Sequence, residues 1–317
     1  MNKRERFFSA VQGKPVDRPP VTAWVHFQSD HLQGREVADL HLAFLRAYDW
    51  DVLKVMNDFR YAVPEGVQTL ADVSSLKAYR PQGLKVPAVQ AQLDCLSRLQ
   101  DELRGEVPLL ETAFEPFQQI VRNIGFSQAA DLYRHKDAAL GALEAVTEDL
   151  CAYMGELKAR GIEGMFMSIN GAIPAHLPRG ASEENHELFQ KPFGAAVLRA
   201  AEGMVRVLHV HGASLIMDRV DGYPCEVLSV SDRLPSNPDL AALRKLSDKC
   251  LMGGIDETKI QERALPEIAA EVDAAIAASG KDKFILAPGC TIPSFTSERN
   301  LRYLRAYTRF PEGLLQR

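Results

Sequence analysis

The chain has 317 residues, of which 46% are hydrophobic and 25% are charged, as is usual for a globular protein. Its formal net charge is -5, whereas proteins that bind nucleic acid carry a basic excess, so we expect no nucleic-acid partner. No apolar run approaches the roughly 20 residues that cross a membrane, and the start of the chain lacks the apolar core of a secretory signal. The sequence therefore predicts a cytoplasmic protein that has no membrane partner.

Short β-rich runs alternate with longer helical patterns along almost the whole chain. Eight runs are predicted as strands, at 21–25, 51–56, 107–112, 164–168, 205–210, 226–230, 250–255 and 283–288. Helical patterns lie between them, for example at 138–161 and at 265–280, which ends in a glycine suited to a C-cap. Strands that alternate with helices pair in parallel. Eight such units without a low-complexity linker predict a single-domain α/β protein, a (β/α)8 TIM barrel over residues 1–317.

The five cysteines are widely separated and form no CxxC pair. This pattern is typical of free thiols in a reducing compartment. Neither GxGxxG, GxxxxGK[ST] nor GxSxG occurs in the chain, so we expect neither a bound dinucleotide or nucleoside triphosphate nor a serine nucleophile elbow.

Polar side chains follow nearly every predicted strand, where a (β/α)8 barrel places its active site. These residues are His26, Asn57, Asp58, Glu111, Asn170, His209, His211, Ser231, Asp232, Asp256 and Cys290. Strands run into polar loops in any case, but the repetition favours an enzyme. We expect catalytic roles for Asp58, Glu111 and His26. A loop or helix cap is an equal alternative for Asp58, and a surface pair with an arginine is an alternative for Glu111.

The substrate is expected to contact Asn57, Asn170, Asp232 and Asp256. The last of these follows two glycines at a strand end, where the backbone can approach a ligand closely. For Asp232 the favoured alternative is a solvated loop pair with Arg233.

His209 and His211 stand one residue apart in VLHVHG, so in a strand both imidazoles face the same side. Cys290 follows the last predicted strand, in LAPGCTIP, which lies across the barrel mouth from the fifth. Two imidazoles and a thiolate would leave one position of a catalytic zinc open for substrate. The alternative is that His209 bonds a backbone carbonyl, His211 bonds the substrate, and Cys290 is a buried small hydrophobic residue.

Several segments, taken in order, resemble the uroporphyrinogen decarboxylase superfamily. They are KRERFFSAVQGKPVDRPPV, YDWDVLKVMND, VLHVHG, GYPCEVLSVSDR, LMGGID and ILAPGCTIP. The resemblance spans essentially the whole chain and implies a (β/α)8 barrel with its active-site cleft at the carboxyl-terminal mouth. The superfamily contains metal-free decarboxylases of tetrapyrroles and cobalamin-linked methyltransferases that use zinc.

In the decarboxylase branch, arginines of an RQAGR-like motif hold the substrate carboxylates and an aspartate binds the pyrrole nitrogens. Asp58 is the candidate for the aspartate, but the stretch from Trp24 to Arg35, WVHFQSDHLQGR, lacks both arginines of the motif. A substrate with eight carboxylates is difficult to bind without cations. The GHG stretch of true decarboxylases is also replaced, by PGC at 288–290.

In the methyltransferase branch, the resemblance implies a zinc held by His-x-Cys and a distant cysteine. His209 matches the histidine and Cys290 the distant cysteine, while His211 replaces the middle cysteine, a change that zinc tolerates. We therefore predict a zinc-dependent, methyltransferase-like enzyme that acts on a small molecule. A corrinoid would come on a partner protein because no DxHxxG motif is present. The alternatives are a uroporphyrinogen decarboxylase and a non-catalytic barrel that binds a corrinoid or small acid, and family members often form homodimers.

Overall fold

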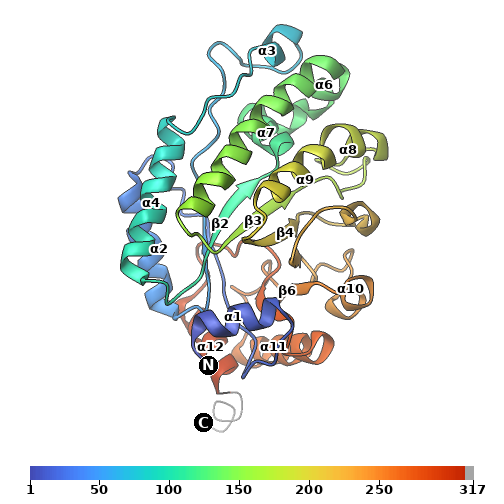
Figure 1. The fold of residues 1–317 in the computed structure, drawn as a ribbon. Coiled ribbons are helices and arrows are strands. Elements are labelled where there is room, and N and C mark those ends of the chain that lie inside the picture. The colour runs from blue at the N-terminus through green and yellow to red at the C-terminus, as the bar shows by residue number, and fades with distance from the viewer. Residues whose placement is uncertain (311–317) are drawn as a thin grey trace.

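The computed structural model describes residues 1–310, which form one parallel sheet surrounded by helices (Figure 1). The sheet has seven strands in the order of the sequence, and each strand pairs with the next in parallel. The strands are β1 (Leu53–Val55), β2 (Leu109–Phe114), β3 (Gly164–Ile169), β4 (Val205–Val210), β5 (Val227–Val230), β6 (Cys250–Ile255) and β7 (Phe284–Pro288). The seven predicted strands from 51–56 onward are thus confirmed.

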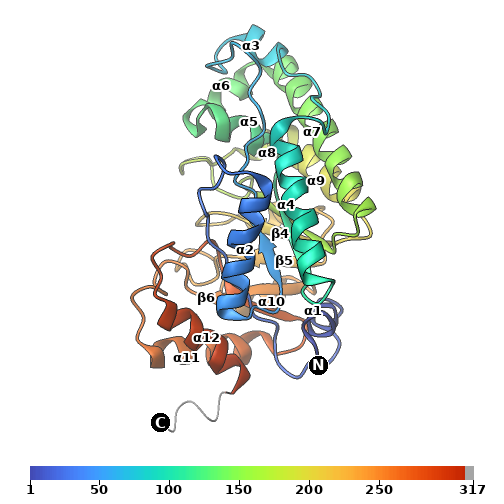
Figure 2. The ribbon, with the colours of Figure 1, turned by 90° about the vertical axis from the view of Figure 1, so that its left-hand side faces the viewer.

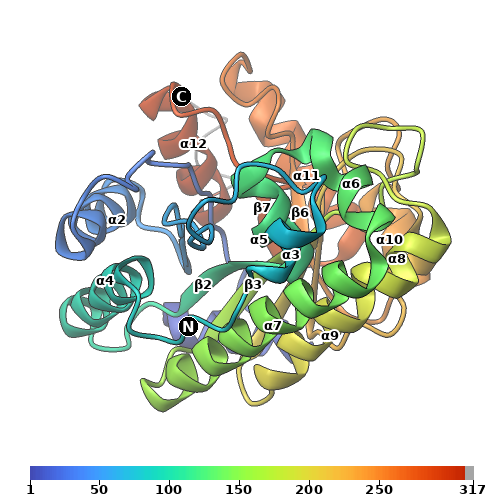
Figure 3. The same cartoon turned by 90° about the horizontal axis from the view of Figure 1, so that it is seen from above.

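Helices cover the outer face of the curled sheet, as the view from above shows (Figure 3). They are α1 (Lys3–Val11), α2 (Gly34–Tyr48), α3 (Val73–Lys77), α4 (Pro87–Leu103), α5 (Pro116–Ile124), α6 (Ala129–Arg134), α7 (Lys136–Ala159), α8 (Glu183–Phe189), α9 (Lys191–Ala200), α10 (Leu240–Leu246), α11 (Leu265–Ser279) and α12 (Glu298–Arg309), with short 3-10 turns η1 (Phe126–Gln128) and η2 (Met217–Val220). Gly280 takes the C-cap of α11 with φ 74°, as its position in the sequence predicts.

The segment 21–25 does not form the predicted first strand, so the eighth strand of the expected barrel is not confirmed. Val21 makes one parallel bridge, to Leu286 of β7. Its carbonyl also accepts a hydrogen bond from the backbone of Asp51, just before β1 (2.9 Å). The segment therefore lies between β7 and β1, but its pairing is short. Pro19–Pro20 immediately before it have no N–H to donate to a ladder.

The two faces of the sheet have different neighbours. One face turns inward and forms a separate apolar cluster, which consists of Phe7, Trp24, Val52, Met56, Leu110, Phe166, Val205, Val207, Val227, Cys250, Met252, Ile285 and Ala287. The alternate residues face the helices and join the larger core. Phe7 comes from α1, so this helix covers the amino ends of the strands (Figure 2). The carboxyl ends remain available for a site.

Two further expectations concern cysteines and membrane spans. All five cysteines are free, as predicted. Within residues 1–310, no helix combines the length and the apolar character that crossing a membrane requires.

Candidate functional site

A cavity of about 220 Å³ lies at the carboxyl ends of the strands. It is lined by His209 of β4, by His211 just after β4, and by Cys290, as the sequence predicts. Side chains from β1, β2, β3 and α5, together with residues from the segment 24–26 and from loops, form the rest of the wall. The predicted metal ligands are therefore brought to one cavity, even though the chain separates the histidines from the cysteine by about 80 residues.

His209 is fixed in orientation by its neighbours in the sheet. Its ring stacks on Phe166 of β3, with ring centroids 5.1 Å apart and an interplanar angle of 29°. Its Nδ1 lies 3.1 Å from Oγ of Ser229, the residue that pairs with it on β5. Burial lowers the pKa of His209 well below its ordinary value, and the nearby charges of His211 and Lys54 lower it further. The ring is therefore neutral, as a metal ligand requires.

His211 lies just beyond the end of β4. Its ring centroid is 5.9 Å from that of His209, in an edge-on arrangement. Burial lowers the pKa of His211 to about 4, and the charge of Arg179 acts in the same direction. Its Nδ1 is buried and has no hydrogen-bond partner within residues 1–310. A buried nitrogen without a partner is costly, so this atom has capacity for a ligand.

Cys290 reaches the cavity from the turn after β7. The chain can take this path only because the preceding residue is Gly289, where an added Cβ would collide with the backbone of Ser231. Burial raises the pKa of the Cys290 thiol. The backbone N–H of Thr291 and the positive charge of Lys54 partly offset this effect.

The three predicted ligands line the same cavity but do not already surround one point. Within the described part of the chain, no three His, Cys, Asp or Glu side chains are arranged so that they could hold a metal ion. Metal binding by His209, His211 and Cys290 would therefore require their side chains to turn toward one another.

Lys54 is the principal cavity residue that the sequence reasoning missed. It is buried on the inner face of β1, and its Nζ donates a hydrogen bond to Oγ1 of Thr112 (2.9 Å). The Nζ atom also lies 4.4 Å from the ring centroid of Phe166 and 5.1 Å from that of Trp24. Burial lowers the pKa of Lys54 to about 7, although the negative charge of a Cys290 thiolate would oppose this. The sequence does contain a sign of it, because a single lysine inside an apolar strand is unusual.

Two arginines that line the cavity were also missed. Arg122 of α5 lies over the Phe114 ring at 3.5 Å from the centroid, and Arg179 lies over Phe126 at 4.0 Å. Burial, followed by the charge of Arg60, lowers the pKa of Arg122 to about 10. The two arginines place two cations at the cavity, whereas the 24–35 stretch lacks both arginines of the RQAGR-like motif. Their positions on a helix and in a loop gave no signal in the sequence.

His26 and Asp58 form a pair at the rim of the cavity. Nδ1 of His26 lies 2.7 Å from Oδ1 of Asp58, and His26 lines the cavity. Burial alone would raise the pKa of Asp58, but its hydrogen bonds with His26 and Ser29 outweigh burial and lower it. A carboxylate that orients an imidazole is suited to proton transfer at the rim.

Glu111 does not face the cavity. It lies on the outer face of β2, where its carboxylate accepts hydrogen bonds from Gln92 (2.8 Å), Tyr153 (3.0 Å) and Asn57 (3.1 Å). Burial raises the pKa of Glu111 to about 7, against the effect of these bonds. Glu111 and Asn57, predicted as catalytic and substrate-binding residues, are thus placed between the sheet and the helices. The alternation of side chains in a strand turns Leu110 and its partners inward instead.

Of the other predicted substrate-binding residues, only Asn170 lines the cavity. Its backbone N–H donates to Oε1 of the buried Glu115 (2.8 Å). Asp232 does not line the cavity; it is buried and accepts a hydrogen bond from the backbone N–H of Gly254 (2.8 Å). Asp256 accepts hydrogen bonds from the backbone and hydroxyl of Thr258 (2.9 and 2.6 Å) and caps the turn after β6.

Solved structures resemble this fold at low sequence identity. A methyltransferase from Methanosarcina mazei is 18% identical with a TM-score of 0.80, and the match covers 98% of each chain. A putative vitamin-B12-independent methionine synthase from Listeria monocytogenes is 11% identical with a TM-score of 0.60, over 94% of this chain and 98% of that chain. A B12-independent methionine synthase from Shewanella sp. W3-18-1, in complex with selenomethionine, is 13% identical with a TM-score of 0.53, over 95% and 96%. These likenesses establish the fold alone.

No curated protein matches the sequence. A family model does match, over residues 60–309, which is most of the chain, and it describes uroporphyrinogen decarboxylase. The match agrees with the order of segments from VLHVHG to ILAPGCTIP on which the sequence resemblance depends. The chain belongs to the uroporphyrinogen decarboxylase (URO-D) family.

Proposed function

We propose that this protein is a zinc-dependent, methyltransferase-like enzyme of the URO-D family that acts on a small, negatively charged molecule. The observation that carries the proposal is that His209, His211 and Cys290 line one cavity at the carboxyl ends of the strands. The fold shared with a methyltransferase supports it. The proposal also treats the segment 21–25 as the counterpart of the first strand of a (β/α)8 barrel.

The donor set fits zinc in its chemistry. Burial keeps both imidazoles neutral, Nδ1 of His211 has no other partner in residues 1–310, and zinc binds mixed histidine and cysteine sites. Zinc would be held by His209, His211 and Cys290. When bound, it would supply a Lewis acid that lowers the pKa of a substrate thiol or hydroxyl.

The chain's own side chains bind and orient the substrate. Arg122 and Arg179 present guanidinium groups that favour a carboxylate or another anion in the cavity. Ser229 holds the ring of His209 in place through Nδ1, as outer hydrogen bonds commonly do for ligand histidines. The positive charge of Lys54 favours the thiolate form of Cys290. Trp24 and Phe166 keep this part of the cavity apolar.

The size of the cavity favours a small substrate. Its volume of about 220 Å³ lies below the roughly 300–1,000 Å³ typical of sites for drug-sized ligands. A corrinoid is larger still, and the chain has no DxHxxG motif. We therefore propose that any methyl group from a corrinoid is delivered by a separate corrinoid protein that docks at the mouth.

The test is the metal content of protein purified without a histidine tag. We expect near-stoichiometric zinc in the wild type and in the control Cys151→Ser, which alters a free cysteine outside the cavity. We expect zinc to be lost in Cys290→Ser and in His209→Ala. Equal zinc content in all four proteins would refute the assignment of the ligands.

A second candidate is decarboxylation, because Arg122 and Arg179 restore part of the positive charge that the 24–35 stretch lacks. This candidate activity predicts that metal-free protein turns over uroporphyrinogen. Turnover that persists after chelation and after Cys290→Ser would favour this activity over methyl transfer. No turnover would leave the arginines as anchors for a smaller anion.

A further inference from the structure

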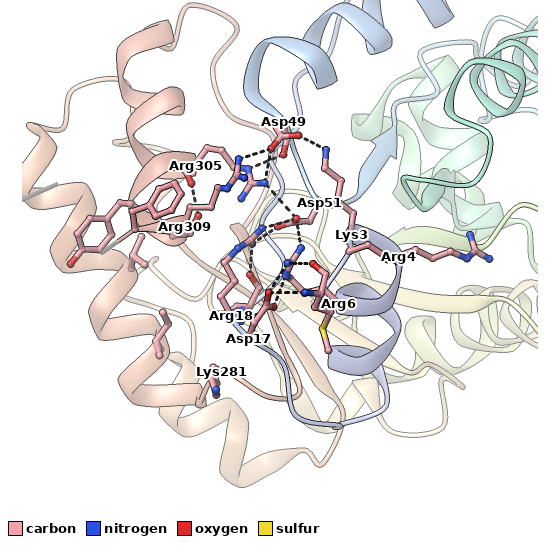
Figure 4. Close-up of a pocket in the computed structure, with 18 of the residues that line it drawn as sticks. Lys3, Arg4, Arg6, Asp17, Arg18, Asp49, Asp51, Lys281, Arg305 and Arg309 are labelled. Atoms are coloured by element: carbon pink, nitrogen blue, oxygen red, sulfur yellow. Dashed lines mark hydrogen bonds and ion pairs between the residues drawn. The ribbon is translucent and has the colours of Figure 1, made fainter. Parts of the chain in front are cut away.

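A larger pocket, of about 1140 Å³, lies at the amino ends of the strands, the opposite end of the sheet from the cavity. Figure 4 shows the side chains that line it. It is bordered by α1, by the residues that precede β1, and by α11 and α12. None of its lining residues belongs to the catalytic cavity. The proposed methyltransferase function therefore assigns it no role.

Charged side chains dominate one wall of this pocket. We call them the basal charge cluster: Lys3, Arg6, Asp17, Arg18, Asp49, Asp51, Arg305 and Arg309. Asp51, which is fully buried, lies at its centre and bonds Arg6 (2.9 Å) and Arg18 (2.5 and 2.9 Å), with Arg305 at 3.6 Å. Asp49 pairs with Lys3 (2.6 Å) and with arginines of α12.

The basal charge cluster has more cations than carboxylates. Its five basic and three acidic side chains leave an excess of two positive charges, in a protein whose net charge is -5. Lys281 lines the same pocket, and Figure 4 shows it apart from the cluster. The pocket is therefore a local positive region on an acidic protein.

Arg305 provides independent evidence that the basal charge cluster lacks an acceptor. Its side chain is 7% exposed, and its Nη1 is buried with no hydrogen-bond partner in the described part of the chain. Burial lowers the pKa of Arg305, and the positive charge of Arg18 contributes in the same direction despite the opposing aspartates. A guanidinium nitrogen left without an acceptor is destabilising, and an anion toward which this nitrogen turned would remove that cost.

We propose that this pocket binds the phosphoryl group of a small molecule. A phosphate dianion would balance the two excess charges, and its oxygens accept bidentate hydrogen bonds from guanidinium groups. Arg309, which is 53% exposed, and Lys281 can turn toward an incoming anion. Arg18 supplies a fixed positive charge beside them, because Asp51 holds it in place.

The experiment measures the Tm of the full chain against inorganic phosphate, at constant ionic strength made up with chloride. Binding to the folded state raises Tm, by about 2 °C when phosphate reaches ten times its Kd. The test variant is the double substitution Arg309→Gln/Lys281→Gln. The matched control, Arg302→Gln/Lys245→Gln, removes the same charge from exposed positions outside the pocket.

The proposal predicts a saturable rise in the wild type and in the control, and an apparent Kd at least fivefold weaker in the test variant. A rise of equal size in the test variant would place phosphate elsewhere, for example at the arginines of the catalytic cavity, and would overturn the proposal. An equal rise in Tm when chloride alone is added, without phosphate, would overturn it as well.

Discussion

Replacing the buried Lys54 by methionine should stabilise the protein, and by more at low pH than at high pH. The Nζ atom lies between the rings of Trp24 and Phe166, and burial lowers its pKa from 10.5 to about 7. Between these two values the unfolded chain binds a proton that the folded chain does not. The stability of the wild type therefore rises with pH through this window, and the cost of the buried amine is full below pH 7 and absent above pH 10.5.

The magnitude follows from the same shift. A lowering of about 3.5 units corresponds to a penalty of roughly 5 kcal/mol below pH 7, as an upper bound. About 2–3 kcal/mol of that penalty disappears between pH 6.5 and pH 9. Methionine has a similar length and suits the aromatic surroundings, so Lys54→Met removes the penalty without opening a cavity.

The assay is urea unfolding at pH 6.5 and pH 9.0, with the exposed Lys245→Met as the control. The gain in unfolding free energy for Lys54→Met over the wild type should be larger at pH 6.5 by about 2–3 kcal/mol, while the control should show no such difference. An equal gain in unfolding free energy at both pH values would refute the conclusion that burial lowers the pKa of Lys54 to about 7.

Three further predictions follow from buried or cavity-lining charges. Asp51→Asn should lower the free energy of unfolding by about 3–5 kcal/mol, because it leaves buried arginines without their carboxylate; a urea midpoint like that of the wild type would contradict this. Arg122→Gln should weaken binding of an anionic substrate by roughly 10- to 100-fold in KM, as expected for a lost charged hydrogen bond, while Arg299→Gln, at an exposed position outside the cavity lining, should change KM little. Burial raises the pKa of Glu115 to about 7, so its carboxylate costs stability above pH 7 and not below its unfolded pKa of 4.5. Glu115→Gln should therefore stabilise the protein at pH 8, by up to about 3 kcal/mol, and not at pH 4.5; a gain independent of pH in urea unfolding would exclude a raised pKa.

The strands could be predicted from the sequence because each is a short β-rich run between helical patterns. The segment 21–25 has the same composition, yet it makes only one bridge. Its pairing is limited because the two prolines before it have no N–H to donate. The composition of the run itself does not reveal this limit.

The side of the sheet that each residue faces was harder to predict. Both faces of a sheet covered by helices are buried, so strands such as VPLLET show no alternation of apolar and polar residues. Glu111 was for that reason expected in the cavity, although it points toward the helices. His209 and His211 were placed correctly because their spacing assigns both to one face whatever the phase of the strand.

The cations of the cavity come from positions that only the tertiary structure brings together. Arg122 and Arg179 lie on α5 and in a loop, far in sequence from the histidines. No spacing rule links them to the strand ends. Lys54 differs from them, because a lysine within an otherwise apolar run is visible in the sequence itself.

The most direct test of the central claim is a Co²⁺ titration of metal-stripped protein, followed by absorption spectroscopy. A thiolate bound to Co²⁺ gives an intense charge-transfer band, so the band reports on Cys290 without any knowledge of the substrate. Zinc ligation by His209, His211 and Cys290 predicts a band that saturates at one Co²⁺ per chain. The band should disappear in Cys290→Ser, persist in Cys151→Ser, and weaken in His211→Ala. A band that survives Cys290→Ser, or no band in the wild type, would contradict a metal-dependent site at the carboxyl ends of the strands.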